Sequence, residues 1–383
     1  MGETHQNIIV DLNIKVFMKI AIIHDWLTTN AGSEKVLKEF LDIYPKADIF
    51  SLVDFLNDSD RESILGDRKV YTSFIQNLPF AKTKFRNYIA LFPLAIEQFN
   101  LSKYDLILSS SHAVAKGVLT YSEQTHISYI HTPIRYAWDL YFRYLEENNL
   151  QKGLKATILK YILHKIRIWD YSTANRVDYY ITNSNYIAKR VSKIYNKNST
   201  TIYPPVDIEK FILNEEKEDF YITVSRLVPY KKIDLIVEAL SQTNKKLVVI
   251  GDGTQMEYIQ SIATSNIEIL GYQDDSVVLD YMGRAKAFIF AGIEDFGITP
   301  VEAMACGTPV IALNQGGLKE SIQDGVNGIF FQEQSTKSII EAINRFEQKL
   351  FKPSIVSKSV LRFSRERFRD EVKEFIKDKN ENI

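Results

Sequence analysis

Short apolar runs alternate with segments of helical periodicity between residues 220 and 347, and this pattern constrains the fold more than any other feature of the chain. The runs "FYITVS", "KKLVVIG", "IEILG", "AFIFA", "PVIAL" and "GIFF" are rich in β-branched and aromatic residues, and helical stretches such as "KKIDLIVEALSQ" separate them. This alternation is typical of successive βαβ units that form a parallel sheet with helices on both faces. The second half of the chain is therefore predicted to be a Rossmann-like domain of the α/β class.

The first half repeats the alternation less regularly, with strands expected at "KIAIIHDW", "ADIFSLV", "YDLILSS", "THISYIH" and "VDYYITNS". The chain has 383 residues, 45% hydrophobic and 25% charged, which suits two globular domains. Proline is disfavoured in helix interiors and central strands, so Pro204-Pro205 in "IYPPVD" marks the junction. We predict a Rossmann-like domain over residues 18–204, a second over 205–360, and a terminal helix within 361–383.

The start of the chain has a separate interpretation. Met18 stands directly before the buried-strand pattern "KIAIIHDW", which makes it a candidate initiator. Residues 1–17 are then a leader or a misassigned start. The alternative is an additional strand, because "NIIV" and "IKVF" could pair.

The composition excludes several kinds of site. A single cysteine, Cys306, excludes an internal disulfide, and one Cys with six His offers no cluster at metal-ligand spacing. We expect no metal, and a reducing compartment, the cytoplasm. No run reaches the roughly 18–20 apolar residues of a membrane span, and "MGETHQNIIVDLNIKVF" lacks the pattern of a secretory signal.

Charge is distributed unevenly along the chain. The net charge is −1, yet residues 80–200 contain 17 Lys and Arg against 8 Asp and Glu. This asymmetry indicates an anionic partner, and a membrane surface, a phosphate-bearing substrate and nucleic acid are the general candidates. Residues 82–92 and 152–168 mix Lys and Arg with large apolar residues at helical spacing, which suits an anionic membrane surface. The alternative is that these are amphipathic helices packed on their own domain.

Facing α/β domains bind ligands at the carboxyl ends of their strands, so the residues just after strands are site candidates. Gly32 precedes a helix start that could approach a phosphate, although it could equally serve only to begin that helix. Arg226 follows "FYITV" and Lys231 lies five residues on, so the two could clamp a diphosphate; the alternative is a solvated basic loop. Gly253 in "GDGTQMEYI" suits a tight turn, but the third glycine of a dinucleotide-binding motif is absent, which argues against a nicotinamide or flavin cofactor.

Two acids flank a turn in "EDFGITPVE". Glu294 follows the strand "AFIFA" and has no structural explanation, so its carboxylate could accept hydrogen bonds from sugar hydroxyls. Glu302 fits a capping box, with Thr299 as the cap and Pro300 as the first helical residue. The free N–H groups of the same helix start could bind a phosphate.

His131 in "YIHTPIRYAW" comes directly after another expected strand. A lone histidine is usually structural, but a strand-end position on the rim of a cleft favours a functional role.

Together these motifs resemble the family 4 retaining glycosyltransferases of the GT-B fold, from Met18 to the final helix. The resemblance is carried by "EDFGITPVE", "RLVPYK", "GDG", "ACGTPVIA", "GGLKESI" and "DGVNGIFF". The segments "HTPIRYAWD", "ITNSNYIAKRV" and "IYPPVD" are similar to bacterial mannosyltransferases that build O-antigen, capsule or exopolysaccharide on a polyprenyl-diphosphate carrier.

The resemblance implies roles for most of the candidate residues. Arg226 and Lys231 would stabilise the leaving diphosphate without a metal. Glu294 would bind the donor hexose with the backbone N–H groups of Phe296, Gly297 and Ile298, Glu302 would reach the ribose, and His131 would lie near the sugar hydroxyls. The terminal helix would cross back onto the first domain. In one departure from the family pattern, Ala31 stands where a first glycine usually precedes Gly32.

The activity implied is retaining transfer of a hexose, with mannose from GDP-mannose as the favoured donor, to a polyprenyl-diphosphate-linked glycan. The expected location is the cytoplasm, peripheral to the inner face of the plasma membrane, with no nucleic acid partner. The alternatives are a UDP-hexose donor or a sugar-nucleotide epimerase. A phosphorylase would need a pyridoxal lysine motif, which is missing, and a sugar-binding protein gives no reason for the Arg226 and Lys231 pair.

Overall fold

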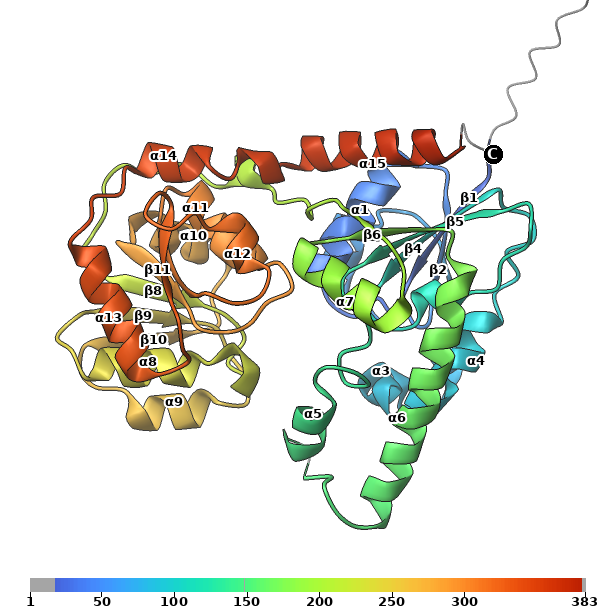
Figure 1. Cartoon of the computed structure of the whole chain (residues 1–383), viewed down its shortest axis with the longest axis horizontal. Helices are drawn as coiled ribbons and strands as arrows, with labels where there is room; N and C mark the ends of the chain where they lie inside the picture. Colours follow the sequence, from blue (N-terminus) through green and yellow to red (C-terminus); the bar gives the residue numbers. More distant parts are fainter. Residues whose placement is uncertain (1–17, 148, 381–383) are drawn as a thin grey trace, which may run out of the picture.

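The computed structural model describes residues 18–147 and 149–380. The predicted leader or additional strand at residues 1–17 lies outside the described residues. Two domains lie side by side, each with a parallel sheet between helices (Figure 1).

The sheet of the first domain has the strand order β3-β2-β1-β4-β5-β6-β7. Its strands are β1 (Ile20–His24), β2 (Asp48–Ser51), β3 (Val70–Thr72), β4 (Leu106–Ser111), β5 (Thr125–Ile130), β6 (Tyr179–Thr182) and β7 (Thr200–Thr201). All pairings are parallel, and the strands β1, β4 and β5 are buried along their whole length, as expected of a sheet covered on both faces. The chain moves outward in one direction from β1 and in the other from β4, so the topological switch point lies between these two strands.

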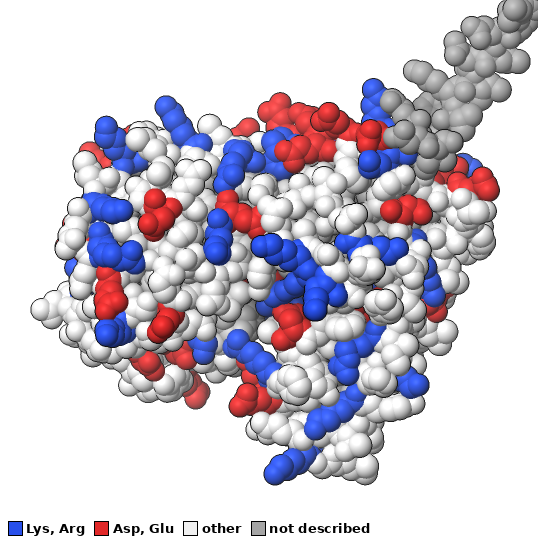
Figure 2. All heavy atoms as spheres, in the orientation of Figure 1, with Lys and Arg blue, Asp and Glu red and all other residues white. Residues whose placement is uncertain are grey.

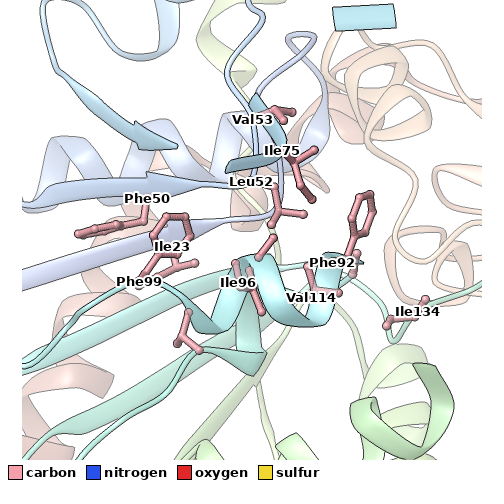
Figure 3. Packing of buried hydrophobic residues seen from close by; sticks show 14 of the residues in the cluster. Ile23, Phe50, Leu52, Val53, Ile75, Phe92, Ile96, Phe99, Val114 and Ile134 are labelled. Atoms are coloured by element: carbon pink, nitrogen blue, oxygen red, sulfur yellow. The ribbon is translucent and has the colours of Figure 1, made fainter. Parts of the chain in front are cut away.

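The helices of the first domain are α1 (Gly32–Ile43), α2 (Asp58–Ile64), α3 (Ala81–Lys84), α4 (Phe92–Glu97), α5 (Tyr141–Glu147), α6 (Leu154–Thr173) and α7 (Asn185–Tyr195). Short 3-10 helices accompany them: η1 (Phe74–Asn77), η2 (Phe85–Leu91), η3 (Ala115–Gly117) and η4 (Ala174–Arg176). On one face of the sheet, Phe92 and Ile96 of α4 pack with Ile23 of β1 and Phe50 of β2 in a single apolar cluster (Figure 3). This cluster fixes the loops that follow β1 and β4.

The sheet of the second domain has the strand order β10-β9-β8-β11-β12-β13. Its strands are β8 (Tyr221–Val224), β9 (Leu247–Ile250), β10 (Ile267–Gly271), β11 (Ala287–Phe290), β12 (Val310–Leu313) and β13 (Gly328–Phe331). The helical elements are η5 (Ile208–Lys210), η6 (Pro229–Lys231), α8 (Ile233–Ser241), α9 (Met256–Ile262), α10 (Asp275–Arg284), α11 (Ile298–Ala305), α12 (Leu318–Ser321), α13 (Thr336–Glu347), α14 (Pro353–Lys358) and η7 (Leu361–Phe363). Here the switch point lies between β8 and β11. The predicted fold class, two Rossmann-like domains with parallel sheets, is confirmed.

Helix α15 (Arg365–Asn380) follows the second domain in sequence but packs on the first (Figure 1). Phe368, Val372 and Ile376 are buried in the same apolar cluster as residues of α1 and β5. The guanidinium of Arg365 donates to the Glu39 carboxylate of α1 at 2.6 Å. The first domain is therefore completed by a helix that the chain reaches only after the second domain.

Within residues 18–147 and 149–380, no helix is long and apolar enough to cross a membrane.

Candidate functional site

The first turn of α11 presents free backbone N–H groups to the space between the domains. Gly297 has φ of 90° and precedes the helix, which begins at Ile298. Across the described part of the chain, no acceptor contacts the N–H groups of Phe296, Gly297 or Ile298. The Phe296 ring is buried against Tyr203 and Phe363, so only the backbone of this residue is available to a ligand. Unpaired N–H groups at a helix start carry partial positive charge and bind anions.

The predicted capping box in this helix is wrong. Thr299 and Pro300 lie inside the first turn, and the Thr299 side chain caps nothing, because the left-handed Gly297 turns the chain into the helix before it reaches Thr299. Glu302 consequently lies further along the helix than a capping acid would. Its carboxylate accepts a hydrogen bond from Lys35 Nζ of α1 at 2.8 Å, across the two domains.

Gly32 lies opposite α11, at the first residue of α1. An added Cβ on Gly32 would lie 3.0 Å from Ile298 Cδ1, so the starts of the two helices face one another across the cleft. The N–H group of Ala31 is already bonded to the Glu34 carboxylate at 3.1 Å. The structure thus brings together two of the predicted donor-binding residues, Gly32 and Ile298.

Lys231 and Glu294 form an ion pair at the switch point of the second domain. Lys231 ends η6 after β8, and Glu294 follows β11, so the adjacency of the two strands brings these side chains together. Each side chain is 19% exposed. The pair places a cation and a hydrogen-bond acceptor next to the free N–H groups of α11.

Arg226 lies in the same loop as Lys231 and is exposed. Gly253 supports this loop: its φ is 158°, and an added Cβ would lie 2.4 Å from the Leu227 carbonyl oxygen. The Leu227 N–H donates in turn to the Asp252 carbonyl at 2.9 Å. The close approach of the "GDG" turn to the Arg226 loop accounts for Gly253, a contact that the motif alone could not reveal.

His131 follows β5 directly, on the first-domain side of the cleft. Its Nε2 lies 2.8 Å from Ser110 Oγ, which also lies 3.1 Å from His24 Nδ1. His24 Nε2 is 3.4 Å from Glu34 Oε1, so a polar row connects the start of α1 to His131. Burial, with His112 and His24 adding to it, holds the pKa of His131 well below its usual value. The imidazole is therefore neutral at pH 7 and can serve as a hydrogen-bond donor or acceptor.

Arg190 of α7 fastens the His131 loop to the Glu294 loop. Its guanidinium donates to Asp295 Oδ1 at 2.9 Å and lies 3.3 Å from Thr132 Oγ1. Arg135 lies 3.5 Å from the other oxygen of Asp295. The residues next to His131 and next to Glu294 are thus tied together across the domains. Sequence analysis missed Arg190 and Asp295, although an acid adjacent to Glu294 in "EDFG" was a visible signal.

A second link joins α12 to α7. The Glu320 carboxylate accepts the N–H groups of Asn185 and Tyr186 at 2.8 and 2.9 Å. An acid of the second domain therefore caps a helix of the first, where the helix dipole favours negative charge.

A cavity of about 420 Å³ lies between the domains, a volume within the usual range for small-molecule sites. Its lining comes from both domains and from α15, and includes Lys35, Thr299, Glu302, Asp207, Asp275, Met282 and Arg365. The lining does not include Glu294, Lys231 or His131. The cavity therefore lies next to the part of the site that contains Glu302. In the part of the chain that is described, no group of three or more His, Cys, Asp or Glu side chains is placed to hold a metal ion.

The GT-B fold consists of two Rossmann-like domains that face one another across a cleft, with strand-end loops on both sides. Solved structures with this fold match nearly the whole chain. HepE of Anabaena, solved with UDP and glucose, covers 94% of this chain and 100% of its own, with a TM-score of 0.68 and 18% identity. The lipopolysaccharide outer core galactosyltransferase WaaB covers 94% and 100%, with a TM-score of 0.66 and 19% identity. Residues 206–354, most of the second domain, match the family model of glycosyl transferases group 1.

Curated relatives are more similar in sequence but match a shorter part. An uncharacterized glycosyltransferase of Methanocaldococcus jannaschii is 31% identical over 204 residues, 51% of this chain and 58% of that protein. The O-antigen chain mannosyltransferase RfbU of Salmonella typhimurium is 26% identical over 192 residues, 46% of this chain and 53% of RfbU. The chain thus spans little more than half the length of these relatives.

Proposed function

We propose that the protein is a retaining glycosyltransferase that transfers mannose from GDP-mannose to a polyprenyl-diphosphate-linked glycan during the synthesis of a bacterial surface polysaccharide. The observation that carries the proposal is the ion pair of Lys231 and Glu294 beside the free N–H groups of Phe296, Gly297 and Ile298. One small region therefore offers cations and N–H donors for a diphosphate and a carboxylate for a sugar.

The donor would lie along the second domain. Arg226 and Lys231 would hold the diphosphate with the start of α11, which matches the preference of guanidinium, ammonium and helix N-termini for phosphate. Glu294 would then exchange its bond to Lys231 for bonds to sugar hydroxyls. The nucleoside would extend toward Glu302 and the interdomain cavity that Glu302 lines.

The chemistry would consist of breaking the bond between the anomeric carbon and the diphosphate oxygen while the acceptor hydroxyl attacks from the same face. The negative charge that develops on the leaving diphosphate would be stabilised by Arg226, Lys231 and the N–H groups of α11. The departing phosphate oxygen would take the proton of the acceptor hydroxyl. Neutral His131 would form hydrogen bonds with the sugar hydroxyls from the first domain. Because the acceptor hydroxyl is the nucleophile and the protein's own cations and N–H groups stabilise the leaving diphosphate, this reaction would require no protein nucleophile and no metal.

Support for mannose comes from the similarity to RfbU, named as an O-antigen chain mannosyltransferase, over 192 residues or 46% of this chain. HepE has been solved with UDP-glucose, and its likeness to this chain concerns the fold. If the protein binds a UDP-hexose in preference to GDP-mannose, the proposed donor is wrong, but the proposed reaction class, glycosyl transfer, stands.

The donor is tested by calorimetry of the purified protein with GDP-mannose, GDP-fucose, UDP-glucose and UDP-galactose. We expect GDP-mannose to bind most tightly, and Glu294→Ala and Arg226→Ala each to weaken it about tenfold or more, since each removes a charged partner. Glu341→Ala and Lys337→Ala, on the exposed face of α13, are the matched controls and should leave binding unchanged. If no nucleotide sugar binds, or if binding survives both site variants, the proposed activity is wrong.

We propose further that α6 and the segment 82–92 rest on an anionic membrane surface near the lipid-linked acceptor, at the inner face of the plasma membrane. Leu154, Ile158 and Tyr161 are exposed on α6, and Lys155 and Lys165 are exposed beside them. Lys and Arg side chains are spread over the part of the surface that α6 occupies (Figures 1 and 2). Apolar and cationic side chains on one helix surface are the usual basis of interfacial binding.

Vesicle sedimentation tests this contact. Binding should rise with the fraction of anionic lipid and fall for the double variant Lys155→Glu/Lys165→Glu, whereas Lys337→Glu on the second domain should behave like the unmodified protein. Sedimentation that is independent of anionic lipid would rule the membrane contact out.

A further inference from the structure

His112 is an imidazole at the carboxyl edge of the first sheet that the proposed reaction does not use. It follows β4 directly, and its side chain is 21% exposed. Its Nδ1 is buried and lies 3.1 Å from Asp25 Oδ2 without forming a hydrogen bond. In the part of the chain that the structure describes, no donor or acceptor contacts its Nε2, which is not among the buried atoms. Nε2 is therefore the polar atom of this ring that a ligand can reach.

The histidines on either side of His112 are already engaged. His24 Nδ1 lies 3.1 Å from Ser110 Oγ, and its Nε2 lies 3.4 Å from Glu34 Oε1. His131 Nε2 lies 2.8 Å from Ser110 Oγ. The centre of the His112 ring is 6.0 Å from that of His24 and 6.2 Å from that of His131. His112 thus lies beside the imidazole proposed to bind the donor sugar, with its own ring nitrogen to spare.

Trp26 supplies a second free nitrogen next to His112. It follows β1, the strand paired with β4, and its ring is 4.5 Å from that of His112 at an angle of 88°. The buried rings of Phe85 and Phe92, at 5.5 and 6.1 Å, hold the indole in place. Trp26 is half-buried, and among the described residues no acceptor contacts its Nε1, which also is not a buried atom. One N–H donor and one ring-nitrogen acceptor therefore lie on adjoining rings.

The loop after β4, which begins with His112, lies between two contacts with the second domain. Strand β4 is paired with β1 on one side and β5 on the other. After β1, an added Cβ on Gly32 would lie 3.0 Å from Ile298 Cδ1. After β5, Thr132 and Asp295 contact the same arginine of α7, at 3.3 and 2.9 Å. The free nitrogen of His112 consequently belongs to the side of the sheet that faces the cleft.

We propose that Trp26 and His112 form the site for the acceptor sugar, a hexopyranose whose attacking hydroxyl donates a hydrogen bond to His112 Nε2. The inference rests on the proposed function, which places the donor sugar against His131, the next ring along this edge. A sugar combines apolar ring faces with hydroxyls that both donate and accept. An indole with a free N–H beside a free imidazole nitrogen matches this combination.

Asp25 suits His112 to this contact. Burial lowers the pKa of His112, and the charge of Asp25 partly offsets this, so the imidazole is neutral at pH 7 and its Nε2 can accept a hydrogen bond. The negative charge near Nδ1 strengthens the ring as an acceptor. His112 orients the hydroxyl and polarises its O–H bond while the hydroxyl oxygen bonds to the anomeric carbon, and the proton passes to the leaving phosphate oxygen.

The test uses two conservative variants of the full chain. His112→Phe keeps a ring but removes both ring nitrogens, and Trp26→Phe keeps an aromatic ring but removes the N–H donor. Tyr121→Phe is the matched control, because Tyr121 is exposed in the loop before β5, at the opposite edge of the sheet. The probes are the octyl glycosides of mannose, glucose, galactose and N-acetylglucosamine.

Nuclear magnetic resonance of protein with isotope-labelled histidine measures the contact directly. At least one glycoside should shift the Nε2 signal of His112, which is identified by its loss in His112→Phe. His112→Phe and Trp26→Phe should each weaken that glycoside about tenfold, since each removes one hydrogen bond, and Tyr121→Phe should bind it like the unmodified protein. If none of the four glycosides shifts the His112 signal, the inference is overturned.

Calorimetry with nucleotide sugars separates this inference from the proposed function. His112→Phe should bind the donor as tightly as the unmodified protein does while its kcat/KM for the glycoside falls about tenfold or more. If His112→Phe weakens the donor but binds the glycoside normally, the inference is overturned and the function stands. If the unmodified protein binds no nucleotide sugar, the function fails, and the His112 signal decides on the sugar site by itself. Thermal unfolding without ligand checks the fold of each variant, and Trp26→Phe keeps the test decisive if His112→Phe does not fold.

Discussion

The Glu320 carboxylate accepts the backbone N–H of Tyr186 at 2.9 Å, so the two domains are joined by a helix cap whose acid and helix come from different halves of the chain. Together with the Arg190 and Asp295 pair, this contact holds α7 against the loop that carries Glu294. The geometry of the candidate site is therefore coupled to the distance between the domains.

Replacing Glu320 should loosen this arrangement. Glu320→Ala removes an anion at the start of α7 and leaves two N–H groups without their partner, at a cost of about 1–2 kcal/mol to the closed arrangement. We expect the radius of gyration from small-angle scattering to increase, and to increase further in Glu320→Ala/Arg190→Ala. Glu341→Ala is the control, and an unchanged radius in the double variant would show that these contacts do not hold the domains together.

Asp25 should be essential for the stability of the first domain. Its fully buried carboxylate accepts the backbone N–H groups of His112, Ala113, Val114 and Ala115 at 2.6–2.9 Å. Asp25→Ala leaves these donors without a partner inside the protein, and we expect a loss of about 3–5 kcal/mol in the free energy of unfolding.

Urea unfolding measures this loss, with Asp370→Ala on the exposed side of α15 as the control. A loss below about 1 kcal/mol for Asp25→Ala would mean that water or a local rearrangement satisfies the four N–H groups.

Stability should fall on acidification below pH 6.5. Burial lowers the pKa of His126 to about 4, whereas a histidine in the unfolded chain titrates near 6.5. Between these values the unfolded state binds a proton that the native state does not, so the free energy of unfolding decreases as the pH falls. For His126 alone the expected decrease between pH 7 and pH 5 is about 2 kcal/mol.

The measurement is urea unfolding at both pH values for the unmodified protein, His126→Gln and the exposed control His164→Gln. Burial also lowers the pKa of His112 and His131, so His126→Gln should reduce the pH dependence without abolishing it. An identical pH dependence in His126→Gln and the unmodified protein would contradict the assignment to His126.

Phe368 of α15 should stabilise the first domain rather than the second. Its ring is fully buried and lies 5.8 Å from the rings of Phe40 and Tyr129. Phe368→Ala should cost about 3–5 kcal/mol, as is usual for a buried aromatic residue. Hydrogen exchange should show that Phe368→Ala lowers the protection of the backbone amides in β1, β4 and β5. The control Phe142→Ala, at an exposed position, should have almost no effect. Equal losses in both sheets would contradict the assignment of α15 to the first domain.

The fold could be predicted from local patterns because strand and helix periods are properties of neighbouring residues. The prediction of two parallel-sheet domains is confirmed. At α11 a local pattern was misleading: "TPVE" is typical of a capping box, yet the left-handed Gly297 begins the helix before Thr299. The positive φ of Gly297 determines where this helix begins, and the residue types alone do not reveal that angle.

The site could be predicted only within each domain. Strand-end positions identified Lys231, Glu294 and His131 as candidates, and their roles stay predictions. Arg190 and Glu320 could not be found in this way, because their partners belong to the other domain, 105 and 135 residues distant in sequence. Such contacts depend on how the two domains meet, which the pattern of a single segment does not contain.

The return of α15 also determines when the first domain can mature during translation. The strands of the first sheet end at Thr201, but the apolar cluster that α1 forms on one face of this sheet is complete only when Phe368, Val372 and Ile376 have been synthesised. The second sheet, complete at Phe331, can form its core before that point. The first domain is thus begun before the second and finished after it, and in the interval the apolar residues that α15 later covers stay exposed.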